Sequence, residues 1–166
     1  MGCRCVLLLA MMGCMSGLWG QNLFLQSLDA SALPDSACID RINDYAYTLV
    51  KAKPDSADFY AQEAISRSHA AHGYAKGLIN AHILLGILNK DRGYYGISVE
   101  NYLKALKLAE GAGDSLRVSG CLNNLGSVYY EQGNFRNALA YFQRSLAIEN
   151  KIGNDKGQAS IRLVNL

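Results

Sequence analysis

Polar and apolar positions along the chain fall into blocks of about twenty residues, and a glycine closes most of the blocks. The glycines that recur at this spacing are Gly73, Gly93, Gly113, Gly133 and Gly153. Each of them predicts a helix boundary, because glycine adopts without strain the left-handed backbone conformation that ends many helices. The pattern predicts helices at about residues 36–52, 55–71, 75–91, 95–111, 115–131, 135–151 and 155–166.

The first two of these helices carry further markers at their starts. Asp35 or Ser36 is expected to cap the first helix after Pro34, since short polar side chains accept hydrogen bonds from exposed backbone amides. Pro54 is expected just outside the start of the second helix. The stretch before both helices, residues 21–34, is interpreted as a linker.

The chain also repeats itself. A shift of 40 residues places Gly126 on Gly86, and a further 40 places Gly86 on Ala46. The same shift places Phe142 on Tyr102. A glycine inside a helix costs about 1 kcal/mol relative to alanine. We interpret the small residues as points where two helix backbones approach closely and aromatic side chains fill the space beside them, so that packing offsets this cost.

The repeated positions resemble the tetratricopeptide repeat in a long form. That family has a Leu-Gly pair and an aromatic residue on the first helix of each repeat, then a small-aromatic-small series on the second helix. In the last complete repeat these residues are Leu125, Gly126, Tyr129, Ala138, Phe142 and Ser145. The preceding repeat has Leu85, Gly86, Ser98, Tyr102 and Ala105, with Asn89 in place of the first-helix aromatic. The most divergent repeat has Ala46, Ala57, Ala61 and Ala64, and a turn one residue shorter.

The resemblance covers roughly residues 35–166 and implies an all-α fold. The expected architecture is a solenoid of antiparallel helix pairs, with about three repeats and an unpaired helix at the C-terminal end. Because stacked repeats need a terminal element with a polar outer face, we interpret the repeat domain as truncated at its C-terminus.

The resemblance also implies a binding site, since the first helix of each pair lines a concave groove in this family. The expected groove residues are Asn43, Tyr47, Val50, Asn80, Ile83, Ile87, Lys90, Asn123, Ser127 and Tyr130. An amide both donates to and accepts from an extended peptide backbone. An alternative role for Asn123 and Asn124 is to satisfy polar groups within the repeat, and the sequence does not decide between the two. The family's clamp for C-terminal carboxylates is not expected, because Asn123 and Ser127 occupy the places of its Lys and Asn.

Composition and motifs indicate no catalytic chemistry. The formal net charge is +2, and no basic stripe suggests a nucleic-acid partner. No phosphate-binding loop, nucleophile elbow or zinc-protease motif is present, so we expect no enzyme activity, no cofactor and no metal. His69 and His72 are expected to share a helix face, which would bind a metal weakly at best; a solvated face is the preferred interpretation. Cys38 and Cys121 lie two repeats apart, too far for a disulfide, and are expected to be small packing residues.

The N-terminus has the features of a secretory leader. Arg4 precedes an apolar run of ten residues, too short to cross a bilayer, and small residues follow. The preferred interpretation is a signal peptide over residues 1–20, cleaved after Gly20. The alternative is a lipoprotein signal with Cys14 as the lipidated residue. Either leader predicts export across the inner membrane, to the periplasm or cell envelope. Contact with the membrane is expected only through Cys14 or through a downstream segment of a longer gene.

Two functions fit these features. The first is a non-enzymatic, exported scaffold that binds a protein or peptide in its groove. The alternative is the N-terminal sensor fragment of a two-component signalling protein, a histidine kinase or a transcriptional regulator, because a signal peptide followed by long tetratricopeptide repeats resembles the extracytoplasmic part of such proteins. In neither case does the sequence specify the ligand or the oligomeric state.

Overall fold

Seven α-helices make up the described part of the chain, which comprises residues 18–30 and 33–153 of this computed structural model. Within those residues there is no β-strand, which confirms the all-α prediction. The helices are α1 (Leu18–Asp29), α2 (Asp35–Leu49), α3 (Pro54–Ala70), α4 (Ala75–Asp91), α5 (Tyr95–Gly111), α6 (Ser115–Glu131) and α7 (Phe135–Lys151).

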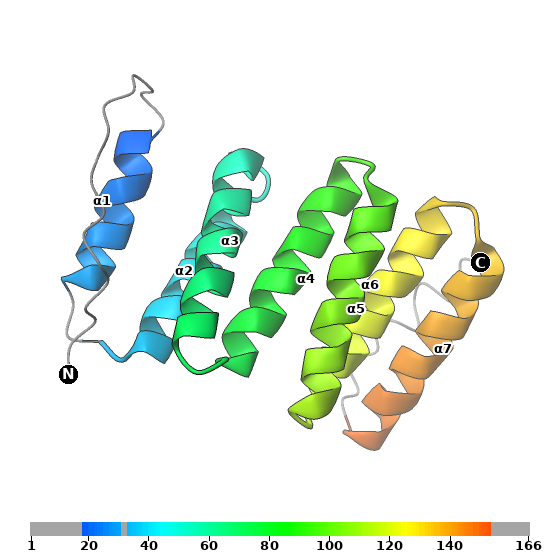
Figure 1. Ribbon diagram of the computed structural model, residues 1–166. Coiled ribbons are helices and arrows are strands. Elements are labelled where there is room, and N and C mark those ends of the chain that lie inside the picture. Colours follow the sequence, from blue (N-terminus) through cyan, green and yellow to red (C-terminus); the bar gives the residue numbers. More distant parts are fainter. Residues whose placement is uncertain (1–17, 31–32, 154–166) are drawn as a thin grey trace.

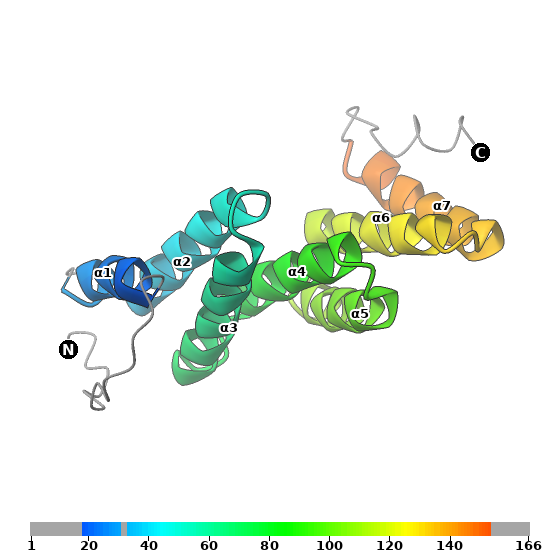
Figure 2. The same cartoon turned by 90° about the horizontal axis from the view of Figure 1, so that it is seen from above.

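The helices stand side by side in a row and run alternately up and down (Figure 1). Three pairs follow α1: α2 with α3, α4 with α5, and α6 with α7. Seen from above, α3 and α5 lie on one side of the row and α2 and α6 on the other, with α4 between them (Figure 2). This arrangement confirms a tetratricopeptide-like solenoid of helix pairs. We call α2, α4 and α6 the first helices and α3, α5 and α7 the second helices.

The glycine boundaries lie where the sequence predicts them. Gly93 has φ 79°, and Gly113 and Gly133 have φ 67° and 73°. At the end of α4 the Gly93 amide donates to Lys90 O at 2.9 Å and the Tyr94 amide donates to Asn89 O at 2.8 Å. This pair of bonds satisfies two carbonyl groups at the helix end. The same pattern recurs at Gly113 and Gly133, so the helices from α4 to α7 follow one another through turns of similar geometry.

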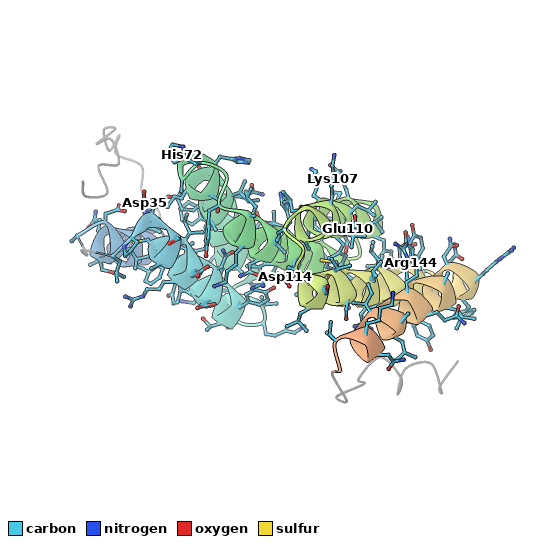
Figure 3. The ribbon with its side chains drawn as sticks, turned by 90° about the horizontal axis from the view of Figure 1, so that it is seen from below. Asp35, His72, Lys107, Glu110, Asp114 and Arg144 are labelled. Carbon is cyan, nitrogen blue, oxygen red and sulfur yellow. The ribbon has the colours of Figure 1, made fainter. Side chains whose placement is uncertain are left out.

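The observed starts of the helices agree less well with the starts that the sequence predicts. At α6, Asp114 (Figure 3) is the cap and accepts a hydrogen bond from the Arg117 amide at 3.0 Å. At α2 the expected cap is wrong, because the helix begins at Asp35 itself and Pro34 precedes it without a side-chain cap. Pro54 is the first residue of α3 rather than a residue outside it, since its missing N–H is not needed in the first turn.

The expected linker over residues 21–34 is wrong for most of its length, because α1 extends to Asp29. Leu25 and Leu28 of this helix are buried in the same core as residues of α2 and α3. The Phe24 ring lies 4.3 Å from the Tyr45 ring. Asp29 forms an ion pair with Arg67 of α3 at 2.6 Å. The described part of the chain therefore begins with a helix packed on the first pair.

The core confirms the interpretation of the small residues. A Cβ atom placed on Gly86 would lie 2.4 Å from Cε1 of Tyr102, so the α4 backbone rests directly on that ring. In the first pair, Ala46 stands in place of the glycine and Ala61 in place of the aromatic residue, and both are fully buried. Cys121 and Cys38 are buried too and form no disulfide with each other, as expected.

Two sets of predictions concern residues outside the described part: the leader as far as residue 17, and the helix over 155–166. Among the helices that the structure does describe, none has both the length and the hydropathy that a bilayer crossing requires.

Candidate functional site

The expected groove residues all lie on first helices or directly after one. Asn43 and Tyr47 lie on α2, with Val50 immediately after its end, and the remaining seven are on α4 and α6. We call the surface that α2, α4 and α6 share the first-helix face. The structure shows that the residues on this face have different surroundings.

Two of the amides bind the neighbouring helix. Asn43 has no exposed surface, and its Nδ2 donates to Gly77 O on α4 at 3.2 Å. Asn80 is partly buried, and its Oδ1 accepts a hydrogen bond from Arg117 Nε on α6 at 3.1 Å. Each amide thus joins a first helix to the next one along the stack. Asn43 in particular is not accessible to a ligand, because the α2–α4 contact covers it.

Asn123 occupies the place on α6 that Asn43 occupies on α2. It is partly buried, and within the described part of the chain its Oδ1 is enclosed without a hydrogen-bond partner. A buried amide oxygen without a partner costs about 1–3 kcal/mol. The Oδ1 atom of Asn43 is enclosed without a partner in the same way, but Asn43 has no exposed surface at all, whereas Asn123 is partly exposed.

Ion pairs connect the C-terminal ends of the first helices. Lys51, just after α2, pairs with Asp91 of α4 at 2.7 Å, and Lys90 of α4 pairs with Glu131 of α6 at 3.0 Å. Lys90 is one of the expected groove residues. Its charge is matched by Glu131, so this edge of the face is electrically balanced. Exposed pairs of this kind stabilise a fold by at most about 1 kcal/mol.

Aromatic and aliphatic side chains provide most of the remaining accessible surface. Tyr47 is 39% exposed and Tyr130 is 44% exposed. Between them, Ile83 and Ile87 on α4 are partly buried against the core. Ser127 is also partly buried. The first-helix face thus presents phenol rings at both ends and an aliphatic middle.

Tyr47 combines an exposed ring with a phenol in a buried environment. Burial raises the pKa of this phenol to about 12, and the charge of Arg117 opposes the shift. Both observations hold if one edge of the ring faces solvent while the hydroxyl points between the helices. The phenol is therefore neutral at physiological pH and acts as a hydrogen-bonding group with an apolar ring.

The described residues contain no group of three or more His, Cys, Asp or Glu side chains placed to hold a metal ion. His69 and His72 do not share a helix face, contrary to the sequence interpretation. His69 is in the last turn of α3, whereas His72 follows the helix with φ 57°. The left-handed backbone at His72 redirects its side chain.

A family model matches part of the chain. Residues 77–151 match a family model described as tetratricopeptide repeat. No curated protein sequence matches the chain. The family match begins in α4 and ends with α7, so it covers the two pairs in which a glycine lies against an aromatic ring. Tetratricopeptide repeats are typically non-catalytic scaffolds for protein interaction. Together, the family match over this part of the chain and the paired helices support a protein of the tetratricopeptide-repeat type.

Proposed function

We propose that this scaffold binds a peptide segment of a partner protein along the first-helix face, without catalysis. The observation that carries the proposal is the pairing of exposed Tyr47 and Tyr130 with the aliphatic side chains of Ile83 and Ile87 between them. Tyrosine supplies a large contact area at a low entropic cost, and it is enriched among residues that dominate binding. Ser127, which is partly exposed, adds a polar contact.

The polar groups of this face favour an uncharged or weakly charged peptide. Asn43 and Asn80 are used in the stack, and the lysines at the edge are matched by Asp91 and Glu131. A ligand therefore meets few unpaired charges, and its affinity should change little with salt.

The test begins with peptides selected from a random library against the immobilised full chain. Amide hydrogen exchange with and without the selected peptide then locates the site. Binding on the first-helix face should slow exchange in α2, α4 and α6. Protection confined to α3, α5 and α7 would show that the ligand binds the second helices instead.

We also propose that the chain is exported. The support is the sequence of residues 1–20, with a single positive charge before a short apolar run. Mass spectrometry of the protein from a Gram-negative host should find Gln21 as the first residue. A lipidated Cys14 would support the alternative leader, and an intact Met1 would contradict export by either route.

The second candidate function is the sensor part of a two-component signalling protein. Its support is the combination of a leader and long repeats in one chain. The genomic sequence beyond codon 166 distinguishes the two candidates. An apolar stretch of about 20 residues followed by a kinase or DNA-binding domain favours the sensor, whereas a stop codon after a polar capping helix favours the free scaffold.

A further inference from the structure

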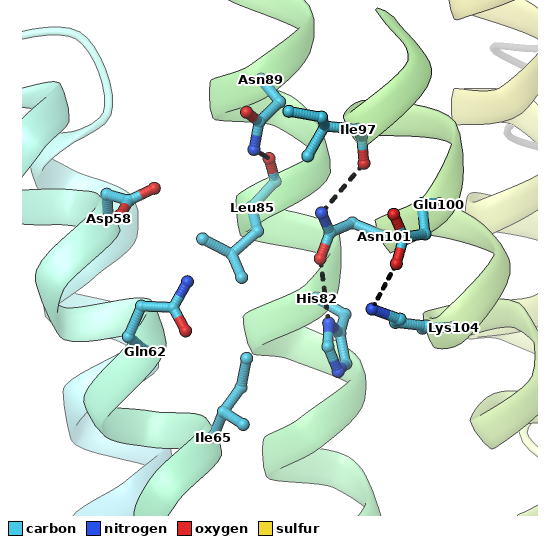
Figure 4. A pocket seen from close by; sticks show the side chains of 10 residues that line it. All are labelled: Asp58, Gln62, Ile65, His82, Leu85, Asn89, Ile97, Glu100, Asn101 and Lys104. Carbon is cyan, nitrogen blue, oxygen red and sulfur yellow. Dashed lines mark hydrogen bonds and ion pairs between the residues drawn. The ribbon is translucent and has the colours of Figure 1, made fainter. Parts of the chain in front are cut away.

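A polar hollow opens on the other side of the row from α2 and α6, between α3 and α5, with α4 at its base (Figure 4). Its volume is about 420 Å³, within the range of small-ligand sites. Its lining consists of Asp58, Gln62, Ile65, His82, Leu85, Asn89, Ile97, Glu100, Asn101 and Lys104. None of these belongs to the expected groove, so the hollow is separate from the first-helix face.

Two amides line the hollow at positions where the following repeat has two aromatic rings. Asn89 and Asn101 correspond, 40 residues on, to Tyr129 and Tyr141 at the next junction of the stack. There the two tyrosine rings are stacked, 5.4 Å apart and tilted by only 6°. The rings occupy the space that the shorter amides leave open. The same place in the fold is thus polar between α4 and α5 and aromatic between α6 and α7.

Asn89 directs an acceptor into the hollow. The residue is only 9% exposed, and its Nδ2 donates to Leu85 O at 2.8 Å. The amide oxygen is left facing the gap, toward the α3 side (Figure 4). This oxygen is an acceptor that water or a ligand in the hollow can reach.

The neighbouring amide and imidazole are held in fixed orientations. Asn101 donates from Nδ2 to Ile97 O at 2.9 Å, so its oxygen faces His82 Nδ1 at 3.1 Å. Burial lowers the pKa of His82, although the hydrogen bond to Asn101 opposes this shift. The neutral imidazole therefore donates from Nδ1 to Asn101, and its Nε2 is an acceptor.

Carboxylates lie on both sides of these acceptors. Asp58 on α3 is 3.4 Å from an Arg92 nitrogen, and Arg92 makes a shorter contact of 2.7 Å with Asp55. On α5, Glu100 pairs with Lys104 at 2.7 Å. The only cation that lines the hollow is therefore already paired, while Asp58 keeps capacity for another donor. The hollow therefore favours a ligand that is rich in donors, and a positive charge on it would be attracted by Asp58, whose contact with Arg92 is long.

We propose that this hollow binds the arginine side chain of a partner protein. A guanidinium has five N–H donors in a plane and no acceptor, which suits Asp58, Asn89 and Gln62. The aliphatic stem of arginine would lie against Ile65, Leu85 and Ile97. A lysine would reach fewer of the acceptors at once, because its ammonium group is a compact point charge. The site lies outside the first-helix face and does not depend on peptide binding there.

The experiment titrates the full chain with N-acetyl-arginine N-methylamide and follows the side-chain amide signals of Gln62 and Asn89 by NMR. A neutral control ligand, the citrulline analogue, has nearly the same shape without the charge. We expect saturable shifts with half-saturation on the order of 1 mM for the arginine compound. The citrulline compound should bind at least about tenfold more weakly, because charge-assisted bonds are roughly twice as strong as neutral ones.

The decisive variant is Asn89→Tyr with Asn101→Tyr, which introduces the ring pair of the next junction. It should abolish the shifts in Gln62. Asp58→Asn removes one charge without changing the shape, and it should weaken binding several-fold even if the tyrosine variant fails to fold. Asp44→Asn, an exposed residue on α2, is the matched control and should have no effect. The proposal is overturned if the arginine compound causes no saturable shifts, if citrulline binds equally well, or if Asp58→Asn binds like the parent chain.

Discussion

Gly126 lies directly against the ring of Phe142: a Cβ atom on this glycine would stand 2.6 Å from Cε1 of the ring. Gly86 and Tyr102 have the same relationship one repeat earlier. Phe142 is only 2% exposed, so its ring has little room to move away. The contact between the two helices of a pair thus depends on the absence of a side chain at one position.

Gly126→Ala should therefore destabilise the fold by about 1–3 kcal/mol, the usual cost of overpacking. Gly120→Ala is the matched control on the same helix, because nothing lies within 4 Å of a Cβ there. It should stabilise by up to about 1 kcal/mol through helix propensity. Urea unfolding measures both, and equal shifts of the two midpoints would contradict the close-approach explanation.

Arg67 connects α1 to the first helix pair, and this connection can be tested separately. Burial by itself lowers the pKa of Arg67, but hydrogen bonds with Asp29 and Glu63 outweigh it and raise the pKa overall. Asp29→Ala removes the ion pair between α1 and Arg67. Because Asp29 is 36% exposed, we expect a loss of only about 1 kcal/mol, together with faster hydrogen exchange in α1.

Asp44→Ala on exposed α2 surface serves as the control and should leave exchange in α1 unchanged. If Asp29→Ala also leaves it unchanged, the ion pair does not hold α1 on the first pair, and the contacts of Phe24, Leu25 and Leu28 are sufficient.

Stability should fall at alkaline pH because of two buried acidic groups. Burial raises the pKa of the Cys121 thiol from 9.0 to about 12, and that of the Tyr47 phenol from 10.0 to about 12. A group whose pKa is higher in the folded state stabilises fully below the unfolded pKa. That stabilisation is lost as pH rises from about 9 toward about 12.

Urea unfolding at pH 8 and pH 10.5 measures the effect. Between these two values Cys121 alone should contribute a loss of about 2 kcal/mol. The variant Cys121→Ala should lose correspondingly less than the parent chain over the same interval. An identical loss in both would show that the thiol ionises as easily in the folded chain as in the unfolded one.

Local residue chemistry accounts for the parts of the structure that the sequence predicted. The left-handed glycines at 93, 113 and 133 end helices wherever they occur, and a glycine opposite an aromatic position indicates close packing. The α1 helix was missed because it has no counterpart in the repeat, although Phe24, Leu25 and Leu28 form an apolar stripe at helical spacing.

The site was harder to predict, because the role of an amide depends on what lies beside it. Asn43 donates to Gly77 O across the stack and is fully buried, whereas Asn123, at the equivalent position, is partly exposed. The hollow could have been found from one sequence feature, the replacement of the first-helix aromatic by Asn89. The contribution of the second amide, Asn101, could not be predicted from the sequence, because only the structure shows that it lines the same hollow as Asn89.

The proposed role of the first-helix face is tested most directly by the affinity of a library-selected peptide for two matched double variants. Tyr47→Ala with Tyr130→Ala removes both exposed rings from that face. Phe59→Ala with Tyr94→Ala removes two exposed rings elsewhere, on α3 and in the turn before α5. The account predicts that the first variant loses at least about 1–2 kcal/mol of binding free energy, the scale of an interface anchor, and that the second loses almost none. A larger loss in the Phe59 and Tyr94 variant would contradict it.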